Sequence, residues 1–228
     1  MGRMKTLCMA LFAVLALAIA FTTTASAALP DVHVGTGGTY PASAEGTVGT
    51  GAETVGTLET EIGEKLSATK VTATATLNEL SSLGPGELKF TGVTEKAGHL
   101  CNTAGQAEGV VVFSGEYHVV YTVLSPLTAG VLILFSELVV ECNAKKLKIK
   151  VKAPALTKLN VAAGVEVNEY KLETACTKGK QEPREYYNEE GVLTVANLLA
   201  NFGLGFEKAC YVGKPLTLKS AQKVDFLF

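Results

Sequence analysis

The chain has 228 residues but no tryptophan, three histidines and two aspartates, Asp31 and Asp225. A Ser-His-Asp triad needs a buried aspartate that orients the histidine. Because Asp31 and Asp225 lie near opposite ends of the chain, little material remains for such a triad. Paired glutamates would suit a glycosidase, but the sequence singles out no pair. We therefore expect a non-catalytic protein, with an extracellular hydrolase as a remote alternative.

Closely spaced metal ligands are also absent from the sequence. No C-x-x-C pair and no pair of histidines three to five residues apart occurs, although zinc sites typically use such spacings. The sequence thus predicts neither a zinc site nor any other cofactor.

Charge is missing from the seventeen residues between Val119 and Phe135, VVYTVLSPLTAGVLILF. A membrane-spanning helix needs about 20 apolar residues, so this run is short for one. Pro126 and Gly130 interrupt it, and LSPLTAG resembles a turn between two strands. Strands that are buried on both faces have this composition. We predict a buried β-hairpin, with a spanning helix as the alternative.

The first 27 residues resemble a secretory signal peptide. Arg3 and Lys5 precede an apolar run from Leu7 to Phe21, and Ala25-Ser26-Ala27 is a small-residue cleavage site. Removal of these two basic residues leaves 18 of the 20 lysines and arginines against 22 acidic residues, which gives a net charge of −4. This balance predicts no broad affinity for nucleic acid or anionic membranes. After cleavage we expect no membrane span and a secreted or envelope-associated protein.

Four cysteines follow the signal segment: Cys101, Cys142, Cys176 and Cys210. An even number in an exported chain usually forms disulfides. Three connectivities are open. We favour Cys101–Cys142 with Cys176–Cys210, because neighbours along the chain tend to be neighbours in space.

Residues 28–66 are rich in Gly, Thr, Ala and Glu and poor in large apolar residues. We expect a weakly ordered, flexible lead-in, which could act as a spacer from the envelope. A third interpretation is that LPDVHV, residues 29–34, docks as an edge strand.

From residue 67 onward the sequence predicts one all-β domain, 67–228. VTATATL places Val71, Ala73, Ala75 and Leu77 on one face and threonines on the other, as in a half-buried strand. Roughly 10–12 short strands, spaced about 8–12 residues apart, indicate a sandwich or a closed antiparallel barrel. No long helical pattern is found.

Two weak catalytic patterns remain. Ser67 and Lys70 fit S-x-x-K, but the accompanying S-D-N and K-T-G elements of serine acyl-enzymes are missing. Glu116 and His118 are two residues apart on a predicted strand and therefore share a face. They could ligate a metal or act as acid and base, and an ordinary solvent-facing pair is the alternative.

Charge and tyrosine patterns give two candidate contact surfaces. Lys148, Lys150 and Lys152 alternate with apolar residues and therefore point to one side. They form either a strand protected by charge against stray pairing or a cationic strip for a polyanion such as an envelope polymer. Tyr186 and Tyr187 lie among glutamates and could contact a sugar or another secreted protein, or they could be half-buried in a hairpin.

The chain ends with alternating Val224, Phe226 and Phe228, as outer-membrane barrels often do. This makes an outer-membrane β-barrel the second functional hypothesis. The absent tryptophan, the low aromatic content of 7% and the four cysteines argue against it.

Four segments carry a resemblance to known sequences: LPDVHV, GEYHVVYTVLSPLTAGVLILFSELVVEC, GKQEPREYYNEEG and NFGLGFEKA. Over these segments the chain resembles uncharacterised short secreted proteins of actinobacterial genomes. The resemblance implies export from a Gram-positive-type cell and brings no catalytic residues. We expect a secreted or envelope-associated binding or structural domain, whose ligand and partner the sequence does not name.

Overall fold

A computed structural model describes residues 29–77, 83–142, 147–177 and 179–227. The expected signal peptide, 1–27, lies outside these residues. The described residues form 21 strands and no helix, which confirms the all-β class. The strand number exceeds the predicted 10–12 because many segments have only two or three residues, too few to show alternation.

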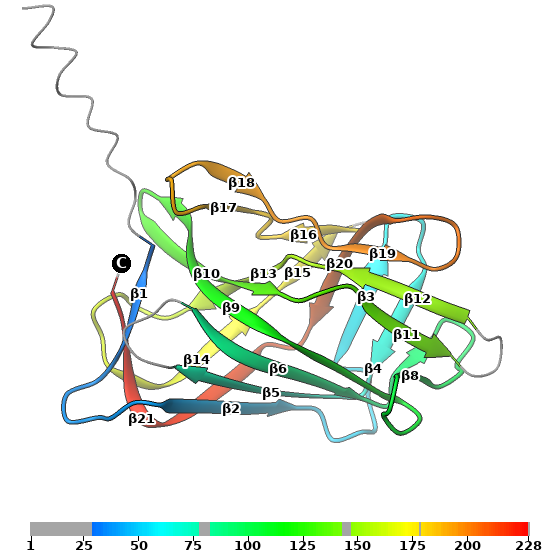
Figure 1. The fold of residues 1–228 in the computed structure, drawn as a ribbon, viewed down its shortest axis with the longest axis horizontal. Helices are drawn as coiled ribbons and strands as arrows, with labels where there is room; N and C mark the ends of the chain where they lie inside the picture. The colour runs from blue at the N-terminus through cyan, green and yellow to red at the C-terminus, as the bar shows by residue number, and fades with distance from the viewer. Residues whose placement is uncertain (1–28, 78–82, 143–146, 178, 228) are drawn as a thin grey trace, which may run out of the picture.

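Eight strands close into an antiparallel barrel, which we call the first tier (Figure 1). Each strand pairs with the next along the chain, and the last pairs with the first. They are β2 (Ala42–Val48), β5 (Lys70–Leu77), β6 (Leu83–Thr91), β9 (Val110–Leu124), β10 (Leu127–Leu134), β13 (Ala155–Asn160), β14 (Val167–Glu173) and β21 (Leu216–Leu227). The sequence is compatible with either a sandwich or a barrel. The pairings of β21 with β2 and of β9 with β10 close the sheet, so the fold is a barrel.

The second tier is an eight-stranded sheet that continues the barrel along its long axis (Figure 1). Its hairpins come from the four long connections of the barrel, all of which leave at the same end because alternate turns of an antiparallel barrel share an end. Its strands are β3 (Gly56–Thr60), β4 (Lys65–Ala68), β7 (Thr94–Glu95), β8 (Cys101–Thr103), β11 (Leu138–Cys142), β12 (Leu147–Lys152), β19 (Leu199–Asn201) and β20 (Glu207–Gly213). They follow the cyclic order of the barrel strands from which they arise. A single bridge, Thr94 to Leu100, joins the β7 and β8 sides.

Five short strands complete the fold. β1 (Asp31–Val34) pairs with the end of β21, so the interpretation of LPDVHV as a docked strand is confirmed. β15 (Ala175–Thr177) and β16 (Lys180–Glu182) form a separate hairpin. β17 (Glu185–Tyr187) and β18 (Leu193–Val195) form another, which joins β9 through Tyr187 and Tyr121.

The structure differs from the prediction of a weakly ordered lead-in over residues 28–66. Within it, residues 31–66 supply β1, β2, β3 and the first half of β4, so the segment is part of both tiers. The sequence signal is weak because β2 turns small residues inward. Ala42 and Ala44 are buried, and a Cβ at Gly46 would lie 2.2 Å from the Thr217 oxygen. Small side chains here reflect close packing, which composition alone does not distinguish from disorder.

The charge-free stretch from Val119 to Phe135 is a β-hairpin, as predicted. β9 and β10 pair from Leu124 and Leu127 outward, and Ser125-Pro126 forms the turn. Val119 and Val131 belong to the core inside the barrel. Val120 and Leu132 are buried outside it, in a cluster that Tyr186 and Ala196 join. Both faces are therefore apolar because both are covered.

In the described ranges no helix has the length and hydropathy that a membrane crossing requires.

Candidate functional site

An apolar cavity of about 100 Å³ lies where the two tiers meet. Barrel strands contribute Phe90 and Phe113, Phe135 directly follows β10, and β20 of the second tier contributes Tyr211. The rings of Phe113 and Phe135 meet edge to face with centroids 5.0 Å apart, and Phe90 meets Phe113 at 5.3 Å. We call this space the junction cavity.

Further cavities extend from the junction cavity in both directions. One of about 60 Å³ lies inside the barrel and shares Leu88, Phe113 and Ile133 with it. A third, of about 30 Å³, shares Tyr117 and Tyr170 with the second. A fourth, of about 40 Å³, enters the second tier. The interior is thus a row of small apolar spaces rather than a fully packed core.

Small residues on β5 and β6 leave this space open. Ala75 lies directly opposite Gly86 in the β5–β6 ladder, so this level of the barrel wall contributes little side-chain volume. Eight-stranded barrels have an interior that side chains just fill or that holds one small ligand. The alternation in VTATATL predicted the inward face of β5 correctly, but it did not predict that the inward alanines border a cavity.

Two residues in the lining of the junction cavity, Thr157 and Gln181, each carry a buried polar atom without a hydrogen-bond partner among the described residues. These atoms are Thr157 Oγ1 and Gln181 Oε1. Gln181 is held from β16 against β13, because its Nε2 donates to the backbone oxygen of Leu156. Thr174 also lines the cavity, and the β13–β14 register places it at the next position opposite Thr157. We call Thr157, Thr174 and Gln181 the polar corner.

Burial keeps three tyrosines of the cavity linings uncharged. Burial raises the pKa of Tyr117 and of Tyr211 to about 12. Burial, with a smaller effect of Tyr117, raises the pKa of Tyr170 well above its usual value. These phenols stay protonated at neutral pH. Lys214 lies in the cavity lining, and its Nζ is 3.3 Å from the Glu53 carboxylate in solvent.

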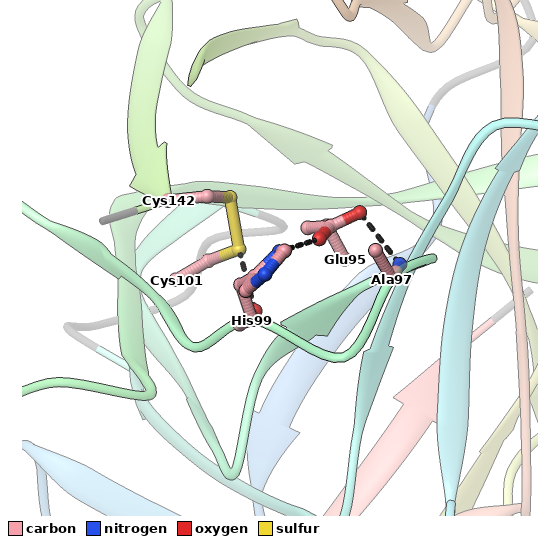
Figure 2. The surroundings of a disulfide bond; sticks show 5 residues. All are labelled: Glu95, Ala97, His99, Cys101 and Cys142. Atoms are coloured by element: carbon pink, nitrogen blue, oxygen red, sulfur yellow. Dashed lines mark hydrogen bonds and ion pairs between the residues drawn. A yellow bond between two sulfur atoms is a disulfide. The ribbon is translucent and has the colours of Figure 1, made fainter. Parts of the chain in front are cut away.

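A histidine and a carboxylate lie at the seam between β7 and β8 (Figure 2). His99 Nδ1 donates to Glu95 Oε1, and the backbone nitrogen of Ala97 donates to Oε2 at 2.7 Å. Burial acts to raise the pKa of Glu95, but these hydrogen bonds and the nearby imidazole outweigh it and lower the pKa. On the other side of His99, the Cys101 sulfur lies 3.4 Å from the His99 backbone oxygen. The cluster lies beside the bridge from Thr94 to Leu100 that joins the β7 and β8 sides.

The predicted cysteine pairing is confirmed. Cys101 on β8 pairs with Cys142 on β11, directly opposite in the ladder. Cys176 on β15 pairs with Cys210 on β20. The first disulfide lies in the core of the second tier, where Cys101 and Cys142 are 0% and 1% exposed. The second ties the β15–β16 hairpin to β20.

The three predicted strip lysines lie together on β12 and face solvent, but each has an acidic partner. Lys148 Nζ is 2.9 Å from Glu141, and Glu137 receives both Lys150 at 2.9 Å and Lys152 at 3.3 Å. Lys152 also lies 4.2 Å from the centroid of the Phe206 ring. β12 is an internal strand between β11 and β19, so protection of an edge is not its role. The spacing of the lysines correctly predicts that they share a face, whereas the glutamates that pair with them come from outside the strand.

Tyr186 and Tyr187 are both half-buried on β17, in the predicted hairpin. Tyr186 packs on the cluster outside the barrel, and burial raises its pKa. Tyr187 lies opposite Tyr121 of β9.

Glu116 and His118 share the outer face of β9, as predicted. Burial lowers the pKa of His118, against the opposing charges of Glu116 and Glu189, and its buried Nε2 has no hydrogen-bond partner among the described residues. Ser67 lies on β4 with its Oγ 3.3 Å from Thr57 Oγ1. In the part of the chain that the structure describes, no three His, Cys, Asp or Glu side chains are grouped as a metal site.

No pattern in the amino-acid sequence predicts the polar corner. Gln181 occurs in GKQEP, a polar turn-like segment that gives no sign of burial, and Thr157 lies between Leu156 and Lys158. The pairing of β16 with β15 and the hydrogen bond to β13 bring Gln181 to the cavity, where Thr157 is already placed by its position on β13 opposite Val131.

Comparisons of this chain with models of protein families, with curated proteins and with solved structures found no match.

Proposed function

We propose that this chain is an exported, non-catalytic binding protein that holds a small apolar molecule in the junction cavity. The row of apolar cavities through a closed barrel carries the proposal. An enclosed apolar cavity of about 150 Å³ stays dry and can bind benzene. The junction cavity with its neighbour of about 60 Å³ offers space of that order.

Export is part of the proposal and has two supports. The N-terminal pattern has the three regions of a secretory signal. Two disulfides are typical of proteins that fold in an oxidising compartment.

Charged side chains on the outside of the barrel weigh against the outer-membrane alternative. Glu45, Lys89 and Glu87 are exposed on β2 and β6, and Lys219 pairs with Glu169 at 2.6 Å across the β14–β21 ladder. A barrel in a bilayer presents an apolar band to lipid, which these residues would interrupt.

Filling the cavity tests the proposal. Ala155 lines the junction cavity, and Ala155→Phe would place a ring in it. Ala221 is exposed on β21, so Ala221→Phe is a matched control outside the barrel. We expect toluene to bind the purified, oxidised protein and the control in isothermal titration calorimetry, and binding to be lost in Ala155→Phe. If toluene does not bind the wild type, or binds Ala155→Phe equally well, the cavity is not a ligand site.

A further inference from the structure

The polar corner gives the junction cavity a chemical preference. A buried polar atom without a hydrogen-bond partner costs free energy, and native proteins rarely keep one without a reason. Here two such atoms, on Thr157 and Gln181, lie in the lining of one cavity whose other walls are mainly apolar. Thr157 is 8% exposed and Gln181 is 4% exposed, so neither residue is open to bulk solvent.

The orientation of the Gln181 amide fixes what it can offer. Because its Nε2 donates to the Leu156 oxygen, its Oε1 is left as an acceptor. The Thr157 hydroxyl both donates and accepts. A matching group on a ligand therefore donates one hydrogen bond and accepts another, as an alcohol or a primary amide does. A carboxylate does not match, since it offers no proton to Oε1.

Resting on the proposed function, we propose that the junction cavity selects an uncharged amphiphile whose apolar part lies against the aromatic wall. Its hydroxyl or amide group donates to Gln181 Oε1 and accepts from Thr157 Oγ1. The wall formed by Phe90, Phe113, Phe135 and Tyr211 suits a ring or a short chain. The single cation of the lining, Lys214, lies at the rim with Glu53 and so gives an anion little additional attraction.

Three ligands of one ring size test the preference: toluene, benzyl alcohol and benzoate. The measured quantity is the ratio of the benzyl alcohol affinity to the toluene affinity, obtained by calorimetry on the full, oxidised chain. Thr157→Val keeps the shape of the side chain and removes the hydroxyl, and Thr157 Oγ1 has no partner within the described structure to lose. We expect the ratio to fall about tenfold, the size of one hydrogen bond.

Gln181→Met provides a second variant in case Thr157→Val folds poorly, and we expect it to lower the ratio in the same direction. Thr217→Val is the control, because Thr217 lies on β21 between the inward residues Leu216 and Leu218 and faces outward. It should keep the wild-type ratio.

The two levels of the proposal fail differently. If none of the three ligands binds, the proposed function is wrong. If toluene and benzyl alcohol bind but Thr157→Val and Gln181→Met keep the wild-type ratio, the cavity binds ligands and the polar corner does not select them. If benzoate binds more tightly than benzyl alcohol, the site prefers an anion and the inference is overturned.

Discussion

Leu132 and Leu156 lie directly opposite each other in the β10–β13 ladder, and both side chains are buried on the outside of the barrel wall. Val120 and Ala196 complete this cluster, with Tyr186 of β17 packed against it. The β17–β18 hairpin therefore covers an apolar surface that would otherwise face water. This arrangement explains why β9 and β10 are apolar on both faces.

Truncation of Leu156 tests the importance of this outer cluster. Leu156 is 0% exposed, so Leu156→Ala should lower the free energy of unfolding by about 2–5 kcal/mol. Leu193→Ala is the control, since Leu193 is 50% exposed on β18, and it should change stability by less than about 0.5 kcal/mol. Urea unfolding of both variants measures the difference, and equal losses would contradict the burial of the cluster.

Each disulfide should stabilise the fold to a similar degree. Cys101 and Cys142 are 41 residues apart, and Cys176 and Cys210 are 34 apart. Loop closure of this size corresponds to about 4 kcal/mol in the chain-entropy model. We expect the Cys101→Ala/Cys142→Ala variant to lose at least that amount, because its sulfurs also fill the second-tier core. Non-reducing peptide mapping should recover both pairs, and four free thiols in exported material would refute the pairing.

Neutralising the β12 lysines should leave the fold intact. The side chains of Lys148, Lys150 and Lys152 are 67%, 46% and 44% exposed, so changing all three to Gln should leave the β-sheet circular dichroism unchanged and Tm nearly so. A Tm loss as large as that of Leu156→Ala would show that these side chains are needed for packing.

The acidic partners of these lysines should suppress polyanion binding. We expect Glu137→Gln with Glu141→Gln to raise the salt concentration that elutes the protein from heparin, because both glutamates pair with the lysines. Glu45→Gln with Glu87→Gln changes net charge equally on the exposed barrel surface and is the control. Equal shifts for both double variants would mean that the strip has no special affinity.

Acid should weaken the fold through His118. Its folded pKa is lowered by burial, so the unfolded chain takes up a proton more readily as pH falls below the ordinary value of about 6.5. Stability is full above that value and decreases down to the folded pKa. Urea unfolding between pH 8 and pH 5 should show this decrease, and His118→Leu should reduce it. An unaltered slope in His118→Leu would refute the assignment.

The sequence was most informative where a strand has one apolar and one polar face. Val71, Ala73 and Leu77 point inward on β5 as predicted, and the β9–β10 hairpin follows from Pro126 and an absence of charge. The cysteine pairing also followed from order along the chain. These features are local, and local patterns record them.

Features that depend on distant pairing could not be predicted in this way. Barrel closure depends on β2 meeting β21, with Ala44 opposite Ser220, and nothing in either segment names the other. The polar corner depends on Gln181 reaching Leu156 across 25 positions. Alternation predicts which face a residue occupies but gives no information about what lies across that face.

The chain passes from the first tier to the second and back four times, so sequence order interleaves the tiers completely. No single cut in the polypeptide separates them, and neither half corresponds to one contiguous stretch that could be expressed or exchanged alone. End-to-end fusion of two contiguous units would not by itself produce this topology. The second tier consists of four neighbouring barrel connections, and the strands of each connection pair with those of its neighbours.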